Sequence, residues 1–281
     1  MPGVSLLLFE SHPFTIANAD VPRMDTAGAV AEGPPEKGSA KSEDARGKEL
    51  VFVVRARQGL TKRLMDVAQK GGPVKVFVDG PYGVPPSLKG FDTVVFIAGG
   101  SGVTFTSPLL LDLVRRARQD PSACRRVIFL WSIRHADHIN LAYADLAHAL
   151  AHAPASLSID ARIHITSPED GASEASSIAS PEAAVAADEE NEERGSVEDE
   201  KSLAKIARLP RTTVARGRPD VEGAIEEACA LARGSVSVNV CGPASLSRRV
   251  RGALCAPVKG PVSVLRGGPS VELHVEQFGI A

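Results

Sequence analysis

Four small residues separate an apolar run from a segment with helical periodicity. The run is residues 94–98, the small residues are Gly99-Gly100-Ser101-Gly102, and the helical segment opens at Val103-Thr104. A short apolar run that ends in glycines and continues as a helix is typical of a strand, a tight loop and a helix. In such a loop a diphosphate can approach the backbone closely at the positive end of the helix. The pattern therefore indicates either a nucleotide site or a structural turn without a ligand.

Other functions fit this stretch less well. The strict dinucleotide fingerprint has a third Gly or Ala where Phe105 stands, so the motif is incomplete. No Gly-Lys-Ser or Gly-Lys-Thr follows, which excludes the phosphate-binding loop of ATPases, and the last Gly of a serine-hydrolase elbow is missing. Residues 93–111 carry no charge, but their glycines, their threonines and Pro108 make a poor membrane helix.

Two arginines bear on which nucleotide would bind. In NAD-specific folds an Asp or Glu after the second strand binds the ribose 2′-hydroxyl, whereas here the run 127–133 ends at Arg134. An arginine at this place favours a 2′-phosphate, and hence NADPH over NADH. Arg218 lies between Gly217 and Pro219, which present it rigidly, and is a second candidate. The alternative for either arginine is a solvated surface charge.

Residues 91–281 alternate between predicted strands and helices. The strands are residues 94–98, 127–133, 157–165, 236–241 and 271–275, and the helices follow Thr104, lie near 141–152, and span 221–232 and 246–254. This alternation predicts an α/β domain with a doubly wound parallel sheet and helices on both faces. Ligands of such sheets bind at the carboxyl ends of the strands. The glycine loop, Arg134, Thr166 and Cys241 all fall at such ends, which strengthens the nucleotide hypothesis.

Residues 1–90 have the composition of a different, β-rich domain. Strand-like runs occur near residues 4–10, 49–57 and 74–78, with a helix at 61–69 for which Thr61 is a plausible N-cap. These pieces predict the latter part of a small β-barrel with one helix. Residues 21–48 contain almost no large apolar residue, and residues 168–203 are acidic and rich in Ser and Ala. We expect both segments to be disordered inserts.

Charge and cysteine content narrow the class of protein further. Residues 169–200 carry twelve acidic residues and one basic one, so 31 basic residues face 22 acidic ones in the remainder, a balance that suits anionic ligands. No Lys/Arg stripe alternates with aromatic residues, which argues against nucleic-acid binding.

The four cysteines form no Cys-x-x-Cys pair, and we therefore expect them to be reduced thiols. His148 and His152 have no third metal ligand in the sequence, so we predict no metal site. We also expect a soluble chain without a signal peptide or membrane span.

Six short motifs occur in a fixed order along the chain. They are His12-Pro13-Phe14-Thr15, Asp79-Gly80-Pro81-Tyr82-Gly83, residues 98–104, Gly217-Arg218-Pro219, Cys241-Gly242-Pro243 and Glu276-x-Phe278. Together they resemble the cytosolic FAD- and NADPH-binding half of ferric-chelate reductases and NADPH oxidases, which is built like ferredoxin–NADP⁺ reductase. The resemblance covers nearly the whole chain outside the two inserts.

This resemblance implies roles for individual residues. For FAD, it places Phe14 against the isoalloxazine, Thr15 near the reactive nitrogen and His12 toward the phosphates, and the flavin diphosphate contacts Gly59 and Thr61. For NADPH, it adds contacts from the glycine loop, Arg134, Arg218-Pro219 and Cys241-Gly242-Pro243. Cys241 would lie beside the nicotinamide, while Glu276 and Phe278 would cover the flavin, so the three position and shield the reacting rings. The alternative for each residue is a purely structural role: His12 at a strand end, Phe14 in the core, Thr61 as a helix N-cap, and Cys241 as a small buried residue.

The implied activity is hydride transfer from NADPH to FAD, with electrons passing to membrane haems and then to ferric iron or oxygen. The haem domain would be a partner in the membrane, and this chain would lie on the cytosolic side. Two features depart from the family: its flavin barrel begins tens of residues before the His-Pro-Phe-Thr strand, and Ile280 replaces a terminal aromatic. The alternatives are therefore a shortened remnant that binds NADPH only, and a soluble regulatory module that docks through its acidic tract.

Overall fold

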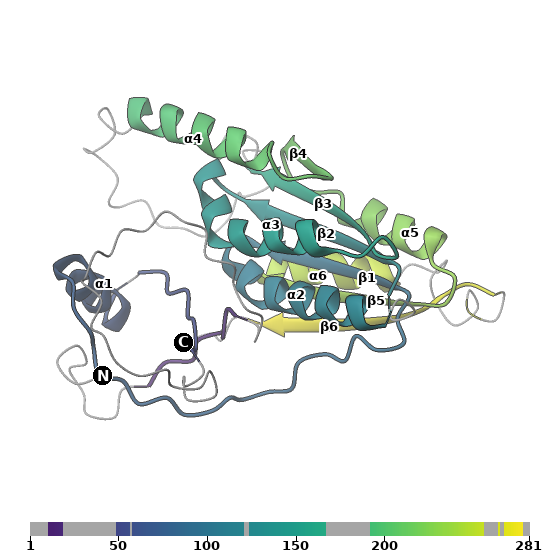
Figure 1. Ribbon diagram of the computed structural model, residues 1–281, viewed down its shortest axis with the longest axis horizontal. Coiled ribbons are helices and arrows are strands. Elements are labelled where there is room, and N and C mark those ends of the chain that lie inside the picture. Colours follow the sequence, from purple (N-terminus) through teal and green to yellow (C-terminus); the bar gives the residue numbers. More distant parts are fainter. Residues whose placement is uncertain are drawn as a thin grey trace, which may run out of the picture.

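The computed structural model describes residues 11–18, 49–56, 58–120, 124–166, 192–255, 264 and 267–277. Most of the described elements belong to one α/β domain, in which helices sandwich a central sheet (Figure 1). No helix among the described residues has the length and apolar character needed to cross a membrane.

Six parallel strands form the sheet, in the order β4-β3-β2-β1-β5-β6. Their bounds are β1 Thr93–Gly99, β2 Arg126–Ile133, β3 Ser158–Ile165, β4 Thr212–Arg216, β5 Ser235–Gly242 and β6 Ser270–Gln277. The chain moves outward from β1 to β4 and then returns to β5 on the other side of β1. The order therefore reverses between β1 and β5, and in such sheets a crevice opens at the carboxyl ends of the strands at that point.

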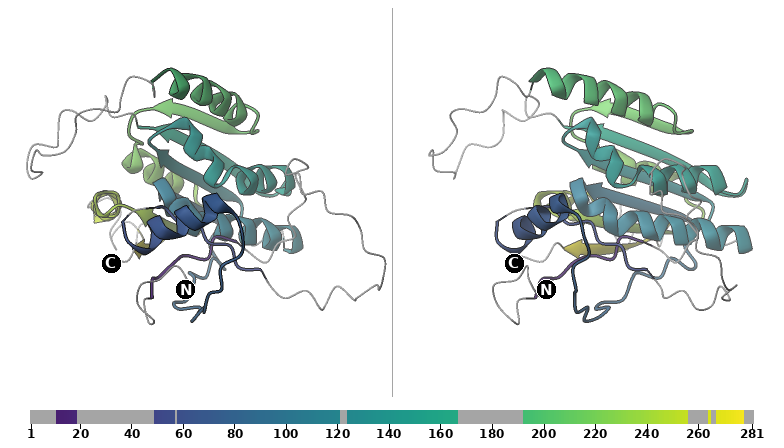
Figure 2. Two further views of the ribbon diagram at one scale, coloured as in Figure 1. Left: turned by 90° about the vertical axis from the view of Figure 1, so that its left-hand side faces the viewer. Right: turned by 60° about the vertical axis from the view of Figure 1, so that its left-hand side comes forward.

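Helices cover both faces of the sheet (Figures 1 and 2). On one face lie α2 (Val103–Gln119) and α3 (Tyr143–His152), and on the other α5 (Val221–Leu231) and α6 (Ala244–Cys255). Every residue of β1 is buried, because alternate side chains enter the two helical layers. The predicted doubly wound parallel sheet is confirmed.

Two elements of this domain were not predicted. Strand β4 extends the sheet beyond β3, and helix α4 (Glu192–Ile206) follows β3 in the chain. The helix corrects the expectation that residues 168–203 are disordered throughout, since residues 192–203 are helical; residues 167–191 lie outside the described part. The acidic composition concealed an apolar stripe, in which Ile206 is fully buried and Leu203 packs against the same core.

The predicted helix of the N-terminal part is confirmed as α1 (Leu60–Lys70), but its predicted cap is wrong. Gly59 holds the N-cap position with φ 72°, and Thr61 lies inside the helix with its hydroxyl donating to the carbonyl of Gln58 at 3.4 Å. Glycine tolerates this positive φ without steric cost.

The predicted barrel strands are not formed in the described residues before the sheet. Among residues 11–18 and 49–90 the β-pairing is one antiparallel bridge, Ile16 to Phe52, and residues 74–78 have no strand partner. Phe77 in that run is 93% exposed. An apolar run becomes a strand only where a neighbour supplies backbone hydrogen bonds, and the described residues supply none there. The predicted strand near residues 4–10 and the predicted insert at residues 21–48 lie outside the described residues.

Candidate functional site

The loops that follow β1 and β5 pack directly on each other at the reversal point. A Cβ on Gly102 would overlap the carbonyl oxygen of Cys241, and a Cβ on Gly99 would stand 2.7 Å from Cδ of Pro243. A Cβ on Gly242 would stand 3.0 Å from the amide nitrogen of Gly99. Three of the predicted cofactor-binding glycines therefore have a packing role, because only a residue without a side chain allows this approach.

Gly100 differs from these three glycines. Its φ is 55°, and no atom lies within 4 Å of the place that a Cβ would occupy. Residues 100–102 form a single 3₁₀ turn, η2, which leads straight into α2 at Val103. Gly100 and Ser101 are half-buried and Gly102 is buried, and the turn places their backbone directly in front of a helix N-terminus, which is the arrangement that binds phosphates.

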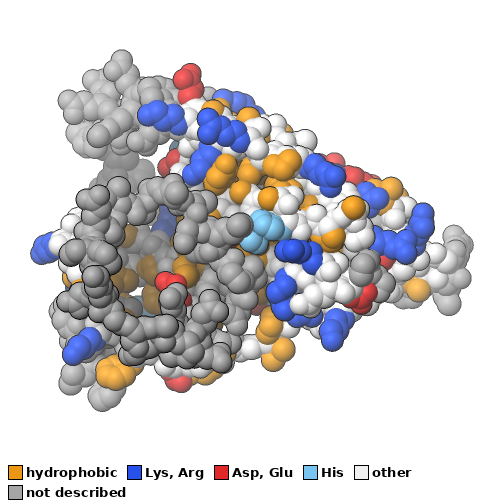
Figure 3. Space-filling view, viewed as in Figure 1, with side chains coloured by type: hydrophobic (Ala, Val, Ile, Leu, Met, Phe, Trp, Pro, Cys, Tyr) orange, Lys and Arg blue, Asp and Glu red, His pale blue; other side chains and the backbone are white. Residues whose placement is uncertain are grey.

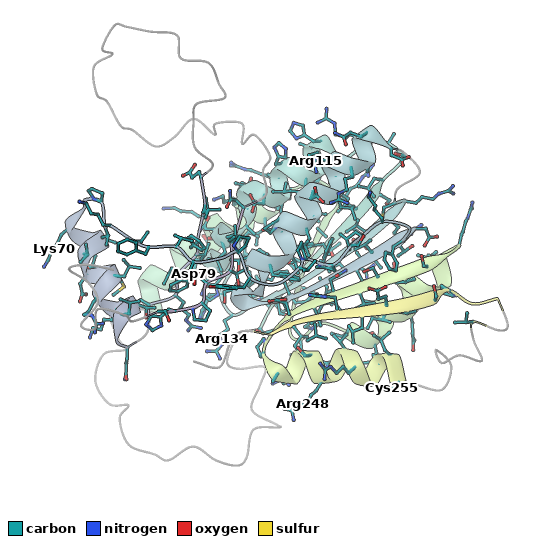
Figure 4. All side chains as sticks on the ribbon, turned by 90° about the horizontal axis from the view of Figure 1, so that it is seen from below. Lys70, Asp79, Arg115, Arg134, Arg248 and Cys255 are labelled. Carbon is teal, nitrogen blue, oxygen red and sulfur yellow. The ribbon has the colours of Figure 1, made fainter. Side chains whose placement is uncertain are left out.

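Arg134 and Arg218 both lie at the carboxyl edge, after β2 and β4. The amide N–H of Thr166 donates to the carbonyl oxygen of Ile133 at 2.7 Å, and the amide N–H of Gly217 donates to the carbonyl oxygen of Ile165 at 2.9 Å. These hydrogen bonds join the end of β2 to the end of β3, and the end of β3 to the end of β4. Neighbouring strands are about 4.8 Å apart, which puts the two arginine-bearing ends roughly 10 Å apart. Both side chains are exposed, and neither forms an ion pair with another described residue. Figure 4 shows Arg134 beyond the end of the sheet toward which β6 runs.

Cys241 and Glu276 are brought together at the ends of β5 and β6, where they are register partners. Burial of the Cys241 thiol, which is 1% exposed, and the nearby Glu276 carboxylate raise its pKa to about 12. The thiol is therefore neutral at physiological pH and is not a nucleophile. Its predicted partner Phe278 lies outside the described residues.

Sequence reasoning missed a contact beside this pair. The ring of Phe105 stacks on that of His274, with centroids 5.5 Å apart, and Nε2 of His274 lies 3.4 Å from the Glu276 carboxylate. Phe105 stands where the dinucleotide fingerprint has a small residue. The only signal for the contact was the i, i+2 spacing of His274 and Glu276, which places both on one face of a strand.

The residues predicted to hold FAD lie in the part of the chain before the sheet. His12 and Pro13 are exposed, Phe14 and Thr15 are half-buried, and the Phe14 ring lies 6.4 Å from those of His12 and Phe52. Figure 1 shows residues 11–18 and α1 on the side toward which the strands point. Their assignment to FAD stays a prediction.

The histidines on α3 form a stacked pair. The rings of His148 and His152 have centroids 4.1 Å apart, and Nδ1 of His152 lies 2.9 Å from the His148 carbonyl oxygen. Burial, the neighbouring ring and Arg118 hold the pKa of His148 below its usual range. Figure 3 shows histidine exposed over α3, beside Lys and Arg side chains. Within the described residues no three His, Cys, Asp or Glu side chains converge to hold a metal ion.

The parallel sheet, the interlocked loops at its reversal point and the glycine turn before α2 define a Rossmann-like nucleotide-binding domain. Residues 91–255 match the family model for the ferric reductase NAD binding domain, and the chain belongs to that family. The predicted family resemblance is thereby confirmed for the NADPH-binding half.

Individual relatives carry corresponding names. The chain is 35% identical over 144 residues to the probable cell surface ferric reductase kap2 of Aspergillus oryzae, a match that covers 50% of this chain and 17% of that protein. It is 26% identical over 242 residues to ferric reductase transmembrane component 5 of Saccharomyces cerevisiae, with coverages of 84% and 28%. It is 23% identical over 256 residues to a probable ferric reductase transmembrane component of Candida albicans, with coverages of 88% and 32%. The chain spans less than a third of the length of these relatives.

Proposed function

We propose that this chain is the NADPH-binding module of a ferric reductase and that it delivers the hydride of NADPH to FAD. The observation that carries the proposal is the carboxyl edge of the sheet. There the turn at Gly100 lies on the same side of the domain as Arg134 and Arg218, which form no ion pair with another described residue. The family of residues 91–255 and the names of the relatives favour ferric iron as the final acceptor, reached through haem in a membrane partner domain.

The chain's own residues have separate tasks in this proposal. The backbone of Gly100 to Gly102 receives the diphosphate, and Arg134 and Arg218 bind the 2′-phosphate through charge-assisted hydrogen bonds. The neutral Cys241 thiol excludes water beside the nicotinamide, and because it is not a thiolate it does not add to the nicotinamide ring. When both cofactors are bound, NADPH supplies a hydride and FAD accepts it.

Residues at the ends of β5 and β6 hold the reacting rings in place. Glu276 lies opposite Cys241 and is paired with His274, which Phe105 covers. Their effect is on orientation and solvent exclusion, because hydride transfer requires the two rings in contact. For the flavin, we propose His12, Pro13, Phe14, Thr15, Gly59 and Thr61 as contacts and Phe278 as a cover.

A second candidate function is NADPH binding without flavin. The observation that favours it is the single β-bridge between residues 11–18 and 49–56, since a flavin barrel needs several paired strands. In this case the chain completes a flavin site only together with further strands.

An absorbance spectrum separates the two candidates. The purified chain is incubated with FAD, passed over a gel-filtration column and titrated anaerobically with NADPH or NADH. A retained flavin band that NADPH bleaches at lower concentration than NADH supports the hydride-transfer module. A colourless protein that still binds NADPH supports the second candidate, and a protein that binds neither cofactor refutes both.

A further inference from the structure

Trp131, the one tryptophan of the chain, lies beneath the glycine loop. Its side chain is 0% exposed on β2, where it packs in the core under α2 and α3. Its indole N–H donates to the carbonyl oxygen of Gly100 at 2.9 Å. We propose that Trp131 is a positioning residue, which aims the backbone N–H of Ser101 at the diphosphate of NADPH; this inference rests on the proposed function.

The geometry of the peptide group links the indole to the ligand side of the loop. In a planar trans peptide the C=O of one residue and the N–H of the next point in opposite directions. Because the Gly100 carbonyl is turned inward to Trp131, the Ser101 N–H points away from the indole. The Thr104 hydroxyl donates to the Ser101 carbonyl at 2.9 Å and fixes the Gly102 N–H in the same manner. The carbonyl oxygens of Gly100 and Ser101, which would repel a phosphate, thus each accept a hydrogen bond from a side chain.

Gly99 and Gly102 on either side are packed against the loop after β5, but Gly100 itself has no such packing contact. No atom would contact a Cβ at this position, and its φ of 55° belongs to a region that glycine can leave freely. The amide of Val103 also donates to the Gly100 carbonyl, but it belongs to the turn itself. Trp131 is different, because it extends from a strand that is hydrogen-bonded on both sides. Such an external anchor pre-organises the donors and lowers the cost of ordering them on binding.

The test compares two nucleotides that share the 2′-phosphate but differ in the diphosphate. Binding of NADPH and of adenosine 2′-phosphate to the full chain is measured by titration calorimetry. The substitution Trp131→Phe keeps an aromatic ring but removes the N–H, and we expect it to weaken NADPH about fivefold to tenfold. Adenosine 2′-phosphate has no diphosphate, so its affinity should stay within about twofold, which is the scatter expected of distant substitutions.

A matched control and a second pair of variants separate positioning from general damage. Phe129 is buried on the same face of β2 and forms no hydrogen bond to the loop, so Phe129→Leu should leave the ratio of the two affinities unchanged. Thr104→Val removes the second donor and should weaken NADPH selectively, while Thr104→Ser should restore binding. This pair decides the question if Trp131→Phe does not fold.

Each outcome has a distinct meaning. Selective loss of NADPH affinity in Trp131→Phe or Thr104→Val supports the positioning role. Equal loss for both nucleotides, or no loss for NADPH, overturns it while the proposed function stands. A wild-type chain that binds neither nucleotide refutes the proposed function and the role of Trp131 in it.

Discussion

Substitution of Gly102 by alanine should break the contact between the loops that follow β1 and β5. The new methyl group would overlap the carbonyl oxygen of Cys241, and the obstacle is backbone, which cannot rotate away as a side chain can. The loops must therefore separate, along with the ends of β1 and β5. Overpacking of a well-packed site typically costs 1–3 kcal/mol, and with backbone as the obstacle we expect about 3 kcal/mol of lost unfolding free energy.

Substitutions at two other glycines provide reference values for this loss of unfolding free energy. Gly100→Ala meets no atom but places a side chain at φ 55°, so it should cost only about 1 kcal/mol. Gly252 lies inside α6 with open space around it, and Gly252→Ala should stabilise the chain by about 0.5–1 kcal/mol.

The three variants are compared by urea unfolding followed by circular dichroism, and by NADPH titration of the folded proteins. The expected order of stability is Gly252→Ala, wild type, Gly100→Ala, Gly102→Ala. If Gly102→Ala unfolds at the same urea concentration as wild type and binds NADPH equally well, the close contact between the two loops stabilises neither the domain nor the nucleotide site.

Three further predictions concern charge, thiol reactivity and a helix cap. Arg134→Ala and Arg218→Ala should each weaken NADPH about tenfold and leave NADH nearly unchanged in titrations, because each removes one charged hydrogen bond; an equal effect on both nucleotides would refute a 2′-phosphate contact. At pH 8 a thiol reagent should label the exposed Cys255 well before Cys241, whose pKa of about 12 keeps it protonated, as peptide mass spectrometry would show; early labelling of Cys241 would contradict its burial. Asp220 caps α5 by accepting from the amide of Gly223 at 2.9 Å, so Asp220→Ala should lower the unfolding free energy by about 1 kcal/mol in a urea titration, whereas Asp220→Asn should restore most of it.

The sequence predicts the centre of the domain better than its edges. Strands β1 and β2 are nearly continuous apolar runs, because both of their faces are buried, and such runs are visible without a structure. Strand β5 reads SVSVNVCG, in which Val alternates with Ser and Asn, and this alternation is also a strand pattern. Strand β4 is exposed at all but one position and reads TTVAR, so it has no apolar signal. Its existence depends on the free edge of β3, which is a tertiary property.

The same division holds for the candidate site. The glycine loop and Arg134 could be predicted because each is attached to an apolar run that ends in a recognisable residue type. The contact of Phe105 with His274 could not, because it joins residues far apart in the chain through the position of β6 in the sheet. The hydrogen bond from Trp131 to Gly100 could not be predicted either, because a buried indole N–H can donate to any nearby carbonyl oxygen.

The place of each proposed contact in the sheet has a consequence for how the domain can diverge. The glycine loop follows β1, which has hydrogen-bonded neighbours on both sides and no exposed residue. Local unfolding of this strand is therefore rare. Arg218 follows β4, an exposed edge strand whose pairing with β3 spans five residues. In the proposed site, binding of any dinucleotide would thus be tied to the most constrained strand, while discrimination by the 2′-phosphate would depend partly on the least constrained one. Preference between NADPH and NADH could then change at this edge without disturbing the core that holds the loop.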